Sequence, residues 1–328
     1  MTVLVTGGAG YIGSHAAKAL RGAGHHVVIY DNLSAGHRVA ALGAPLVEGE
    51  TADTAAVRRA IRESGATAVM HFAASLNVGD SVRDPAAYYR NNVIGSIGTL
   101  EAMAAEGCRV FVFSSSCAVY GEPDSTPITE DHPTRPVNAY GQTKLAVEQA
   151  LPHFERAYGM RAVCLRYFNA AGADPDGQLG EAHDPEIHVI PRAFEALAGG
   201  PLLAVFGQDY ATPDGTCLRD YVHVSDLAAA HVQALAHLER GGASATYNVG
   251  TETPTSVLEV MAAVERVTGR AVPHQLAPRR PGDPAVLVAS AARIRRELGW
   301  TATRPALDTI VADAWRWHAE HPNGFGGK

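Results

Sequence analysis

A glycine-rich turn at the start of the chain most constrains the fold. Residues 3–5 form a short apolar run that predicts a buried strand, and the apolar spacing after residue 11 predicts a helix. The turn between them reads Thr6-Gly7-Gly8-Ala9-Gly10-Tyr11-Ile12-Gly13. Glycines in this context let backbone N–H groups approach a pyrophosphate at the N-terminus of a helix. The sequence therefore predicts a dinucleotide site, with the less common spacing Gly-x-x-Gly-x-x-Gly.

An acidic residue after the second apolar run indicates which dinucleotide binds. Residues 27–30 predict a strand, and Asp31 follows, eighteen residues beyond Gly13. A carboxylate there accepts hydrogen bonds from the adenosine ribose hydroxyls and repels a 2′-phosphate. We therefore expect NAD, although the nearby Arg38 leaves NADP open.

Apolar runs and helical stretches alternate through the first half of the chain. This order predicts right-handed crossovers and a Rossmann-type, doubly wound parallel sheet with an α/β fold. The expected strands are 3–6, 27–30, 45–47, 68–71, 110–113 and 162–165, and the expected helices lie near 11–23, 53–64, 85–106 and 139–158. Functional residues should gather at the carboxyl ends of these strands.

The alternation ends at about residue 170. Stretches rich in glycine and proline then separate short apolar segments from four expected helices, near 189–198, 225–239, 256–268 and 305–319. We expect two domains: an NAD-binding Rossmann domain at 1–170, and a smaller, irregular α/β lobe for substrate at 171–328. Some segments are expected to cross back between the lobes.

Composition excludes several classes of function. The 328 residues are 46% hydrophobic and carry a formal net charge of −7, which favours a folded protein without general attraction for nucleic acid or anionic membranes. The four cysteines are scattered, and the fifteen histidines show no His-x-x-x-His pair. We expect reduced thiols, a cytoplasmic location without a signal peptide or membrane span, and no metal site.

Tyr140 and Lys144 stand four residues apart and would share one face of a helix. A free tyrosine has a pKa of about 10. To act as a base at neutral pH, its pKa must be lowered by roughly 3 units, which corresponds to about 4 kcal/mol. A cation ~4 Å away at an effective dielectric of ~20 supplies about that much. Ser116, twenty-four residues earlier at a strand end, is placed to share a proton with Tyr140. The spacing alone also arises by chance, and serines at strand ends often only satisfy backbone groups.

Several further motifs carry a resemblance to a known family. They are 113–121 (FSSSCAVYG), 140–144 (YGQTK), 165–169 (LRYFN), 206–210 (FGQDY), 214–224 (DGTCLRDYVHV), 247–250 (YNVG) and 277–283 (APRRPGD). With the glycine turn, these motifs resemble the extended short-chain dehydrogenase/reductase family, and within it the UDP-sugar 4-epimerases. The resemblance covers nearly the whole chain. It implies interconversion of UDP-glucose and UDP-galactose by an isomerase with bound NAD, through a transient 4-keto sugar.

The resemblance also implies roles for individual residues. Ser116, Tyr140 and Lys144 would be catalytic. The cofactor-binding residues would be Gly7, Gly10, Tyr11, Ile12, Gly13, Asp31, Asn32, Glu50, Phe72, Ala73, Asn91, Ser114, Tyr140, Lys144 and Tyr167. The substrate-binding residues would be Ser116, Tyr140, Asn169, His188, Val189, Ala204, Phe206, Arg219, Tyr221, Arg280, Asp283 and Leu287. The alternatives are purely structural roles without substrate binding: Arg219 and Arg280 would be surface ion-pair partners, and Phe206 would belong to the core of its lobe.

Three positions depart from the family pattern. Leu76 stands where a known epimerase has a cofactor-binding lysine, and Glu50 replaces the usual adenine-binding aspartate. Leu287 occupies the position that admits or blocks an N-acetyl group on the sugar. N-acetylhexosamine and pentose UDP-sugars therefore stay open as alternative substrates.

Two rival functions can be weighed against the same motifs, which also imply an oligomeric state. A 4,6-dehydratase typically needs carboxylates just after the catalytic serine, where this chain has Cys117 and Ala118. A non-catalytic dinucleotide sensor typically loses the tyrosine or lysine, and both are present here. The resemblance further implies a homodimer in which helices near 85–106 and 139–158 pair across a two-fold axis.

Overall fold

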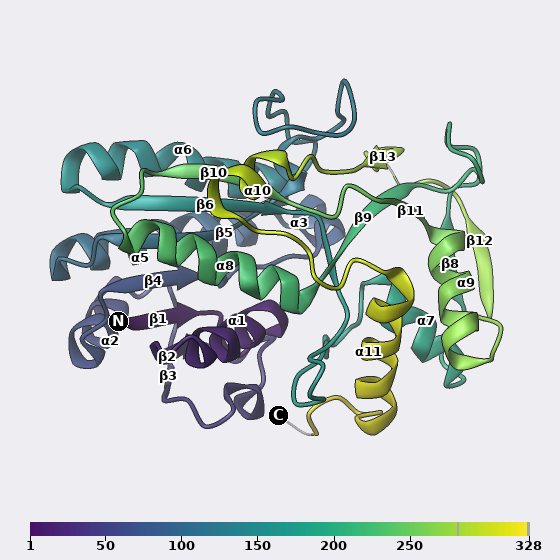
Figure 1. Ribbon diagram of the computed structural model, residues 1–328, viewed down its shortest axis with the longest axis horizontal. Coiled ribbons are helices and arrows are strands. Elements are labelled where there is room, and N and C mark those ends of the chain that lie inside the picture. The colour runs from purple at the N-terminus through teal and green to yellow at the C-terminus, as the bar shows by residue number, and fades with distance from the viewer. Residues whose placement is uncertain (281, 327–328) are drawn as a thin grey trace.

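The computed structural model describes residues 1–280 and 282–326, so Pro281 of the 277–283 motif lies outside the described residues. Its main feature is a seven-stranded parallel sheet (Figure 1). The strands are β1 (Thr2–Thr6), β2 (His26–Asp31), β3 (Leu46–Glu48), β4 (Ala68–His71), β5 (Val110–Ser116), β6 (Arg161–Tyr167) and β10 (Ala245–Val249). Their order is β10-β6-β5-β4-β1-β2-β3, with every neighbouring pair parallel. The predicted Rossmann-type fold is confirmed.

The sheet buries both of its faces. Alternate residues of a strand point to opposite sides, so Val3 and Val5 of β1 enter one hydrophobic core while Leu4 enters the other. Helices α1 (Tyr11–Gly22) and α8 (Val224–Glu239) cover the first face. Helices α2 (Thr54–Ser64), α5 (Gly95–Glu106) and α6 (Ala139–Tyr158) cover the second.

The prediction of one continuous α-helix near 85–106 is wrong. It consists of α4 (Pro85–Tyr88), a π-helical turn (Tyr89–Ile94) and α5, after a short α3 (Val78–Arg83). Residue periodicity does not reveal the wider hydrogen-bond step of a π turn. Such turns are frequent at functional sites, and this one carries Asn91 and Asn92.

The second lobe lies at the right of Figure 1 and contains two small sheets. One joins β7 (Asn169–Ala171), β9 (Leu218–His223), β11 (Pro254–Ser256) and β13 (Val286–Leu287), and the other pairs β8 (Leu203–Phe206) with β12 (His274–Ala277). Helices α7 (Val189–Leu197), α9 (Val257–Thr268) and α11 (Leu307–Glu320) enclose its core. A short α10 (Ala292–Leu298) packs near β10.

The chain returns to the first sheet late in the sequence. Strand β10 pairs with β6 along five residues, and α8 packs against α1. In Figure 1 both segments lie among the elements of the first 170 residues. The boundary at 170/171 therefore stays a prediction, with these two segments as the crossings that we expected. Within the described residues, no helix has both the length and the apolar character to cross a membrane.

Candidate active site

The three glycines of the turn differ in what surrounds them. Gly7 has a φ of +69°, and a Cβ on it would lie 2.5 Å from the Ala73 backbone nitrogen. A Cβ on Gly13 would lie 2.1 Å from the Gly7 carbonyl oxygen. A Cβ on Gly10 would meet only the Gly7 oxygen, at 3.4 Å. Gly7 and Gly13 are thus needed for packing, whereas the side of Gly10 that lacks a side chain leaves open space at the start of helix α1, where a pyrophosphate would fit.

Asp31 is fixed against the glycine turn. Its Oδ2 accepts the Ala9 N–H at 2.9 Å, and its Oδ1 accepts the Leu33 N–H at 2.8 Å. Burial raises the pKa of Asp31, while these two backbone donors lower it. Asn32, which follows Asp31, donates through Nδ2 to both carboxylate oxygens of Glu50, just after the neighbouring strand β3, at 3.1 Å. The three side chains meet at the carboxyl ends of β2 and β3, which fits the ribose and adenine of NAD.

The loop after β4 lies directly beside the turn. The N–H groups of Phe72 and Ala73 both donate to the Thr6 carbonyl oxygen, at 2.9 and 3.2 Å. Tyr11 and Ile12 begin helix α1 on the other side. These residues, predicted for the cofactor, are therefore brought together.

The Asn91-Asn92 pair could, from the sequence, either hold a cofactor-contacting loop or simply cap and turn the chain, and in the structure Asn92 holds a loop. Its Oδ1 accepts the Ser75 N–H at 2.8 Å, and its Nδ2 donates to the Ser75 oxygen at 3.0 Å and to Thr143 Oγ1 at 3.1 Å. Asn91 donates to Ser75 Oγ at 3.2 Å. The π turn thereby ties the 72–75 loop to α6. The adjacent asparagines and the threonine of the 140–144 motif were the available signal.

The expected catalytic residues converge at the end of β5. Ser116 is the last residue of that strand, in register with Tyr167, and the Tyr167 hydroxyl hydrogen-bonds Ser114. Helix α6 begins nearby because Asn138 Oδ1 accepts the Gly141 N–H at 2.8 Å. A Cβ on Gly141 would lie 2.4 Å from the Ala118 carbonyl oxygen, so glycine permits this close approach.

Lys144 reaches across the helix start to this strand. Its Nζ donates to the Ser114 carbonyl oxygen at 2.8 Å and lies 5.8 Å from the centroid of the Tyr140 ring. The side chain is buried, with 3% exposed. Tyrosine, lysine and serine therefore meet at one point, on elements that hold all three in place.

The pKa of Tyr140 is shifted in the direction opposite to our expectation. Burial raises the pKa of Tyr140 to about 12, although the side-chain hydrogen bond with Ser116 lowers it. Burial also lowers the pKa of Lys144 to about 7, against the attraction of Glu148. The sequence argument counted the attraction of the ammonium but not the cost of removing both groups from water. Ser116 is therefore the group that lowers the pKa of Tyr140. The charge of Lys144 depends on the balance between burial and the attraction of Glu148.

A buried ion pair holds α6 against the sheet. Arg166 Nε donates to both carboxylate oxygens of Glu148, at 3.0 and 3.1 Å, and Ser115 Oγ donates to the same carboxylate at 2.5 Å. Arg166 Nη1 donates to Tyr120 OH at 3.0 Å. Glu148 lies one turn beyond Lys144, so this network sets the position of the catalytic helix. The sequence reasoning missed it because a charged pair gives no sign of burial.

The second lobe brings its predicted residues together in two groups. Register pairs Asn169 with Tyr221 and Leu287 with Arg219 on one small sheet. Arg219, 8% exposed, forms an ion pair with Asp283. In the other group, the Arg280 guanidinium lies 4.0 Å from the centroid of the Phe206 ring, on the strand that also carries Ala204.

Arg219 links the two lobes. It acts electrostatically on Cys117, the residue after Ser116, and lowers the pKa of that thiol against the larger effect of burial. Leu287 packs on the cluster that contains Cys117 and Phe168. Arg219 thus lies near the carboxyl end of β5, which carries Ser116.

His188 and Val189 lie at the start of α7, in a cluster of ionisable groups. His188 contacts Glu181, and His183 Nδ1 lies 3.0 Å from the same carboxylate. Burial opposes charge here, but the two imidazoles lower the pKa of Glu181 to about 2, and the carboxylates raise the pKa of His183 to about 10. The His183 ring stands edge-on to Tyr11, with centroids 6.2 Å apart. The cluster therefore lies beside the start of helix α1.

The fold and these side chains define a dinucleotide-dependent enzyme with a tyrosine–lysine pair at the end of its main sheet. The family model described as the NAD dependent epimerase/dehydratase family matches residues 3–250. The chain belongs to this family, and its cofactor is NAD.

Three relatives show how close the similarity is. A UDP-glucose 4-epimerase of Azospirillum brasilense is 53% identical over 96% of this chain and 91% of its own length. The crystal structure of UDP-glucose 4-epimerase from Brucella ovis with NAD is 50% identical, with a TM-score of 0.93 over 96% and 98% of the two chains. The enzyme from Bifidobacterium longum, solved with NAD⁺ and UDP, is 38% identical, with a TM-score of 0.94 over 99% and 100%.

Lys144 gives a prediction on pH and stability. Its pKa falls from 10.5 to about 7 on folding, so between these pH values the unfolded chain binds a proton that the folded protein lacks. The free energy of unfolding therefore gains from this group as pH rises. We expect the stability of the wild type relative to Lys144→Met to increase by on the order of 2 kcal/mol from pH 7 to pH 9. Urea unfolding of both proteins at equal NAD content measures it, and a difference independent of pH would contradict the assigned shift.

Proposed function

We propose that this enzyme interconverts UDP-glucose and UDP-galactose by inverting C4 of the sugar. The observation that carries the proposal is the convergence of Ser116, Tyr140 and Lys144 beside the glycine turn, facing Arg219 of the second lobe. The similarity to UDP-glucose 4-epimerases over nearly the full length supports the same reaction.

The second lobe would hold the nucleotide. Two arginines suit a diphosphate because guanidinium groups form charge-assisted hydrogen bonds to its oxygens. Arg219 and Arg280 are placed for this role, Phe206 offers a ring for the uracil, and Asp283 accepts from the ribose hydroxyls. The remaining contacts that we propose come from Asn169, His188, Val189, Ala204, Tyr221 and Leu287.

The catalytic residues would act on the sugar 4-hydroxyl. Ser116 would hold that oxygen by a hydrogen bond, and the phenolate form of Tyr140 would take its proton to become the neutral phenol. Bound NAD⁺ would supply the site that accepts a hydride from C4 and later returns it to C4. Lys144, fixed by the Ser114 carbonyl, lies beside the phenol and stabilises its charged form when it is itself protonated.

Inversion requires that the sugar be presented in two orientations. Arginine contacts to the diphosphate anchor the nucleotide, while the hexose can turn about that linkage. Both faces of the 4-keto sugar then meet the same catalytic end of β5. Because the cofactor is regenerated within each cycle, NAD stays bound through turnover.

The residues after Ser116 argue against dehydration. Burial raises the pKa of the Cys117 thiol to about 12, and Ala118 carries no ionisable group. Neither supplies the carboxylate that elimination of water needs. Epimerisation needs no such carboxylate, because its proton transfer is assigned to Tyr140 and Ser116 and its hydride transfer to bound NAD.

We also propose that the enzyme acts in the cytoplasm as a homodimer. All four cysteines are buried and unpaired, as expected for a reducing compartment. Large apolar side chains are exposed on the region from α3 to α6, at Val82, Tyr89, Ile94 and Tyr158. This is the surface where we expect helices to pair across a two-fold axis.

A turnover assay without added cofactor tests the function. Purified protein with confirmed bound NAD should convert UDP-galactose into UDP-glucose, with product separated by chromatography. UDP-N-acetylgalactosamine and UDP-arabinose form the other arms of the panel. A protein that carries NAD yet forms no UDP-glucose would refute the proposal, and turnover of another arm alone would reassign the substrate.

A further inference from the structure

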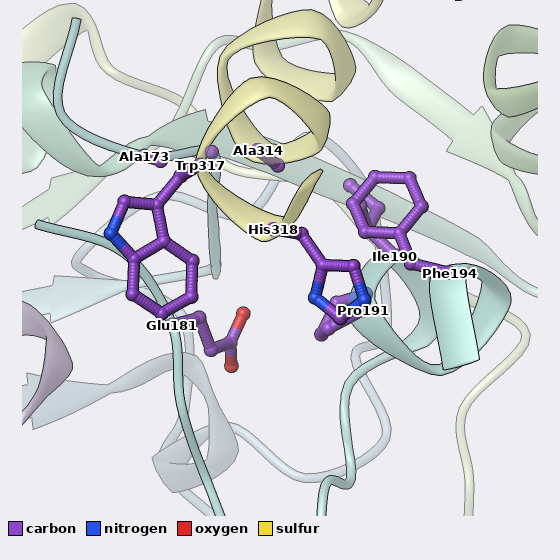
Figure 2. A pocket seen from close by; sticks show the side chains of 9 residues that line it. Ala173, Glu181, Ile190, Pro191, Phe194, Ala314, Trp317 and His318 are labelled. Atoms are coloured by element: carbon purple, nitrogen blue, oxygen red, sulfur yellow. The ribbon is translucent and has the colours of Figure 1, made fainter. Parts of the chain in front are cut away.

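Four potential metal ligands lie within one eight-residue segment of the second lobe. They are Glu181, His183, Glu186 and His188, which precede helix α7. Their ligand atoms all lie within 4.8 Å of one another, and no other such group occurs in residues 1–280 and 282–326. Figure 2 shows the Glu181 carboxylate pointing into a small cavity lined by Trp317, His318 and Pro191.

The spacing of these atoms suits tetrahedral coordination. Bonds of 2.0–2.1 Å to a central zinc ion place ligand atoms about 3.3 Å apart. His183 Nδ1 lies 3.0 Å from Glu181 Oε1 and 3.7 Å from Glu186 Oε1, and His188 Nδ1 lies 3.8 Å from Glu186 Oε1. The remaining contact, between His188 and Glu181, is shorter and would have to lengthen.

Three of the four ligands are shielded from water, whereas the His188 side chain is 39% exposed. The side chains of Glu181, Glu186 and His183 are 7%, 4% and 13% exposed. Glu186 Oε1 accepts the N–H groups of Ile187 and His188, at 2.7 and 3.0 Å, which fixes the carboxylate. The Ala182 carbonyl oxygen accepts from His37 Nε2 at 2.8 Å, which ties the segment to the first lobe.

We propose that Glu181, His183, Glu186 and His188 form a binding site for one divalent transition metal ion of the Zn²⁺ class. Two imidazoles and two carboxylates suit zinc and its neighbours, whereas Mg²⁺ and Ca²⁺ prefer oxygen ligands alone. The two carboxylates balance the charge of the ion. With four protein ligands the site is structural, because no position is left for a reacting water.

Such an ion would fix the segment that leads into α7. His188 and Val189 stand at its end, and the His183 ring lies against Tyr11 at the start of α1. The ion would thereby hold the border between the two lobes; its effect on the sugar site rests on the proposed function.

The competing arrangement is a metal-free cluster in which protonated imidazoles pair with the carboxylates. Both arrangements use the same side chains, so direct metal binding must distinguish them. Co²⁺ is a suitable probe, because it replaces Zn²⁺ and shows intense visible absorption bands when its coordination is tetrahedral.

The experiment uses the full chain with bound NAD, freed of metal by a chelator. Zn²⁺ content after equilibrium dialysis and the Co²⁺ spectrum are recorded for wild type, His183→Gln and Glu186→Gln. His153→Gln, an exposed histidine on α6, is the matched control. NAD content and thermal unfolding show which variants are folded, and two ligand variants guard against failure of one.

We expect about one tightly bound Zn²⁺ per chain and tetrahedral Co²⁺ bands for wild type and His153→Gln. The folded ligand variants should bind Zn²⁺ at least about tenfold more weakly and lose the bands. A wild-type protein that yields no tetrahedral Co²⁺ spectrum, or ligand variants that keep it, would overturn the site. Neither result depends on epimerase activity, so the proposed function is tested separately.

Discussion

Replacement of Tyr140 by phenylalanine is expected to lower kcat for UDP-galactose by about 10³-fold, or about 4 kcal/mol of transition-state stabilisation. The change removes the hydroxyl that exchanges a proton with the sugar and leaves the ring beside Lys144. NAD content should stay near that of the wild type, because the phenol oxygen is a small part of the cofactor site. Product formation under saturating substrate measures the effect.

Tyr158→Phe is the matched control for this variant. Tyr158 ends the same helix, α6, but is 49% exposed and far along the helix from the catalytic turn. Removal of the Tyr158 hydroxyl should leave kcat within about twofold of the wild type. If Tyr140→Phe kept more than a tenth of wild-type kcat, another group would have to be the base.

Alanine substitutions at Gly13 and Gly10 are expected to separate folding from cofactor binding. A Cβ on Gly13 would collide with the backbone of Gly7 at 2.1 Å, so Gly13→Ala should lose about 3 kcal/mol or more of stability. Gly10 has an ordinary φ of −82°, and its new methyl would meet nothing closer than 3.4 Å. Gly10→Ala should therefore stay within about 1 kcal/mol of the wild type.

The same methyl on Gly10 would occupy the space through which the pyrophosphate approaches α1. We expect bound NAD in Gly10→Ala to fall at least about tenfold, a cost above about 1.4 kcal/mol. Denaturant unfolding and the absorbance of released NAD measure the two effects. A Gly10→Ala protein with full NAD content would show that the cofactor does not pass close to this glycine.

The first half of the fold was predictable because each element has its own periodicity. Six strands and three of the four helices expected among them lie within a few residues of the predicted ranges, since continuous apolar runs mark strands buried on both faces. Strand β10 was not recognised as a member of the main sheet. Its five residues contain only short apolar runs, and its pairing with β6 depends on contacts between residues far apart in the chain.

The candidate site was predictable in its members more than in its energetics. The chain's motifs name Ser116, Tyr140 and Lys144, and the structure brings them together. Spacing could not show that burial outweighs attraction, so the direction of the Tyr140 shift was wrong. The buried partner Glu148 was missed because desolvation is a property of the folded chain.

The histidine–carboxylate cluster shows a different limit. We expected no metal site because no two histidines are four residues apart, a test that assumes a helix. The site that we propose at Glu181, His183, Glu186 and His188 lies in a loop, where the backbone rather than helical spacing brings the side chains together. Sequence spacing is informative about such sites only when the local structure is regular.

The late return of α8 and β10 to the main sheet has a consequence for engineering. A fragment that ends at residue 170 would leave one edge of β6 unpaired. It would also expose the hydrophobic surface that α8 covers. Open strand edges recruit other chains, so such a fragment is prone to aggregate. Grafting substrate specificity between homologues should therefore exchange loops or single side chains, and keep the interleaved polypeptide in one piece.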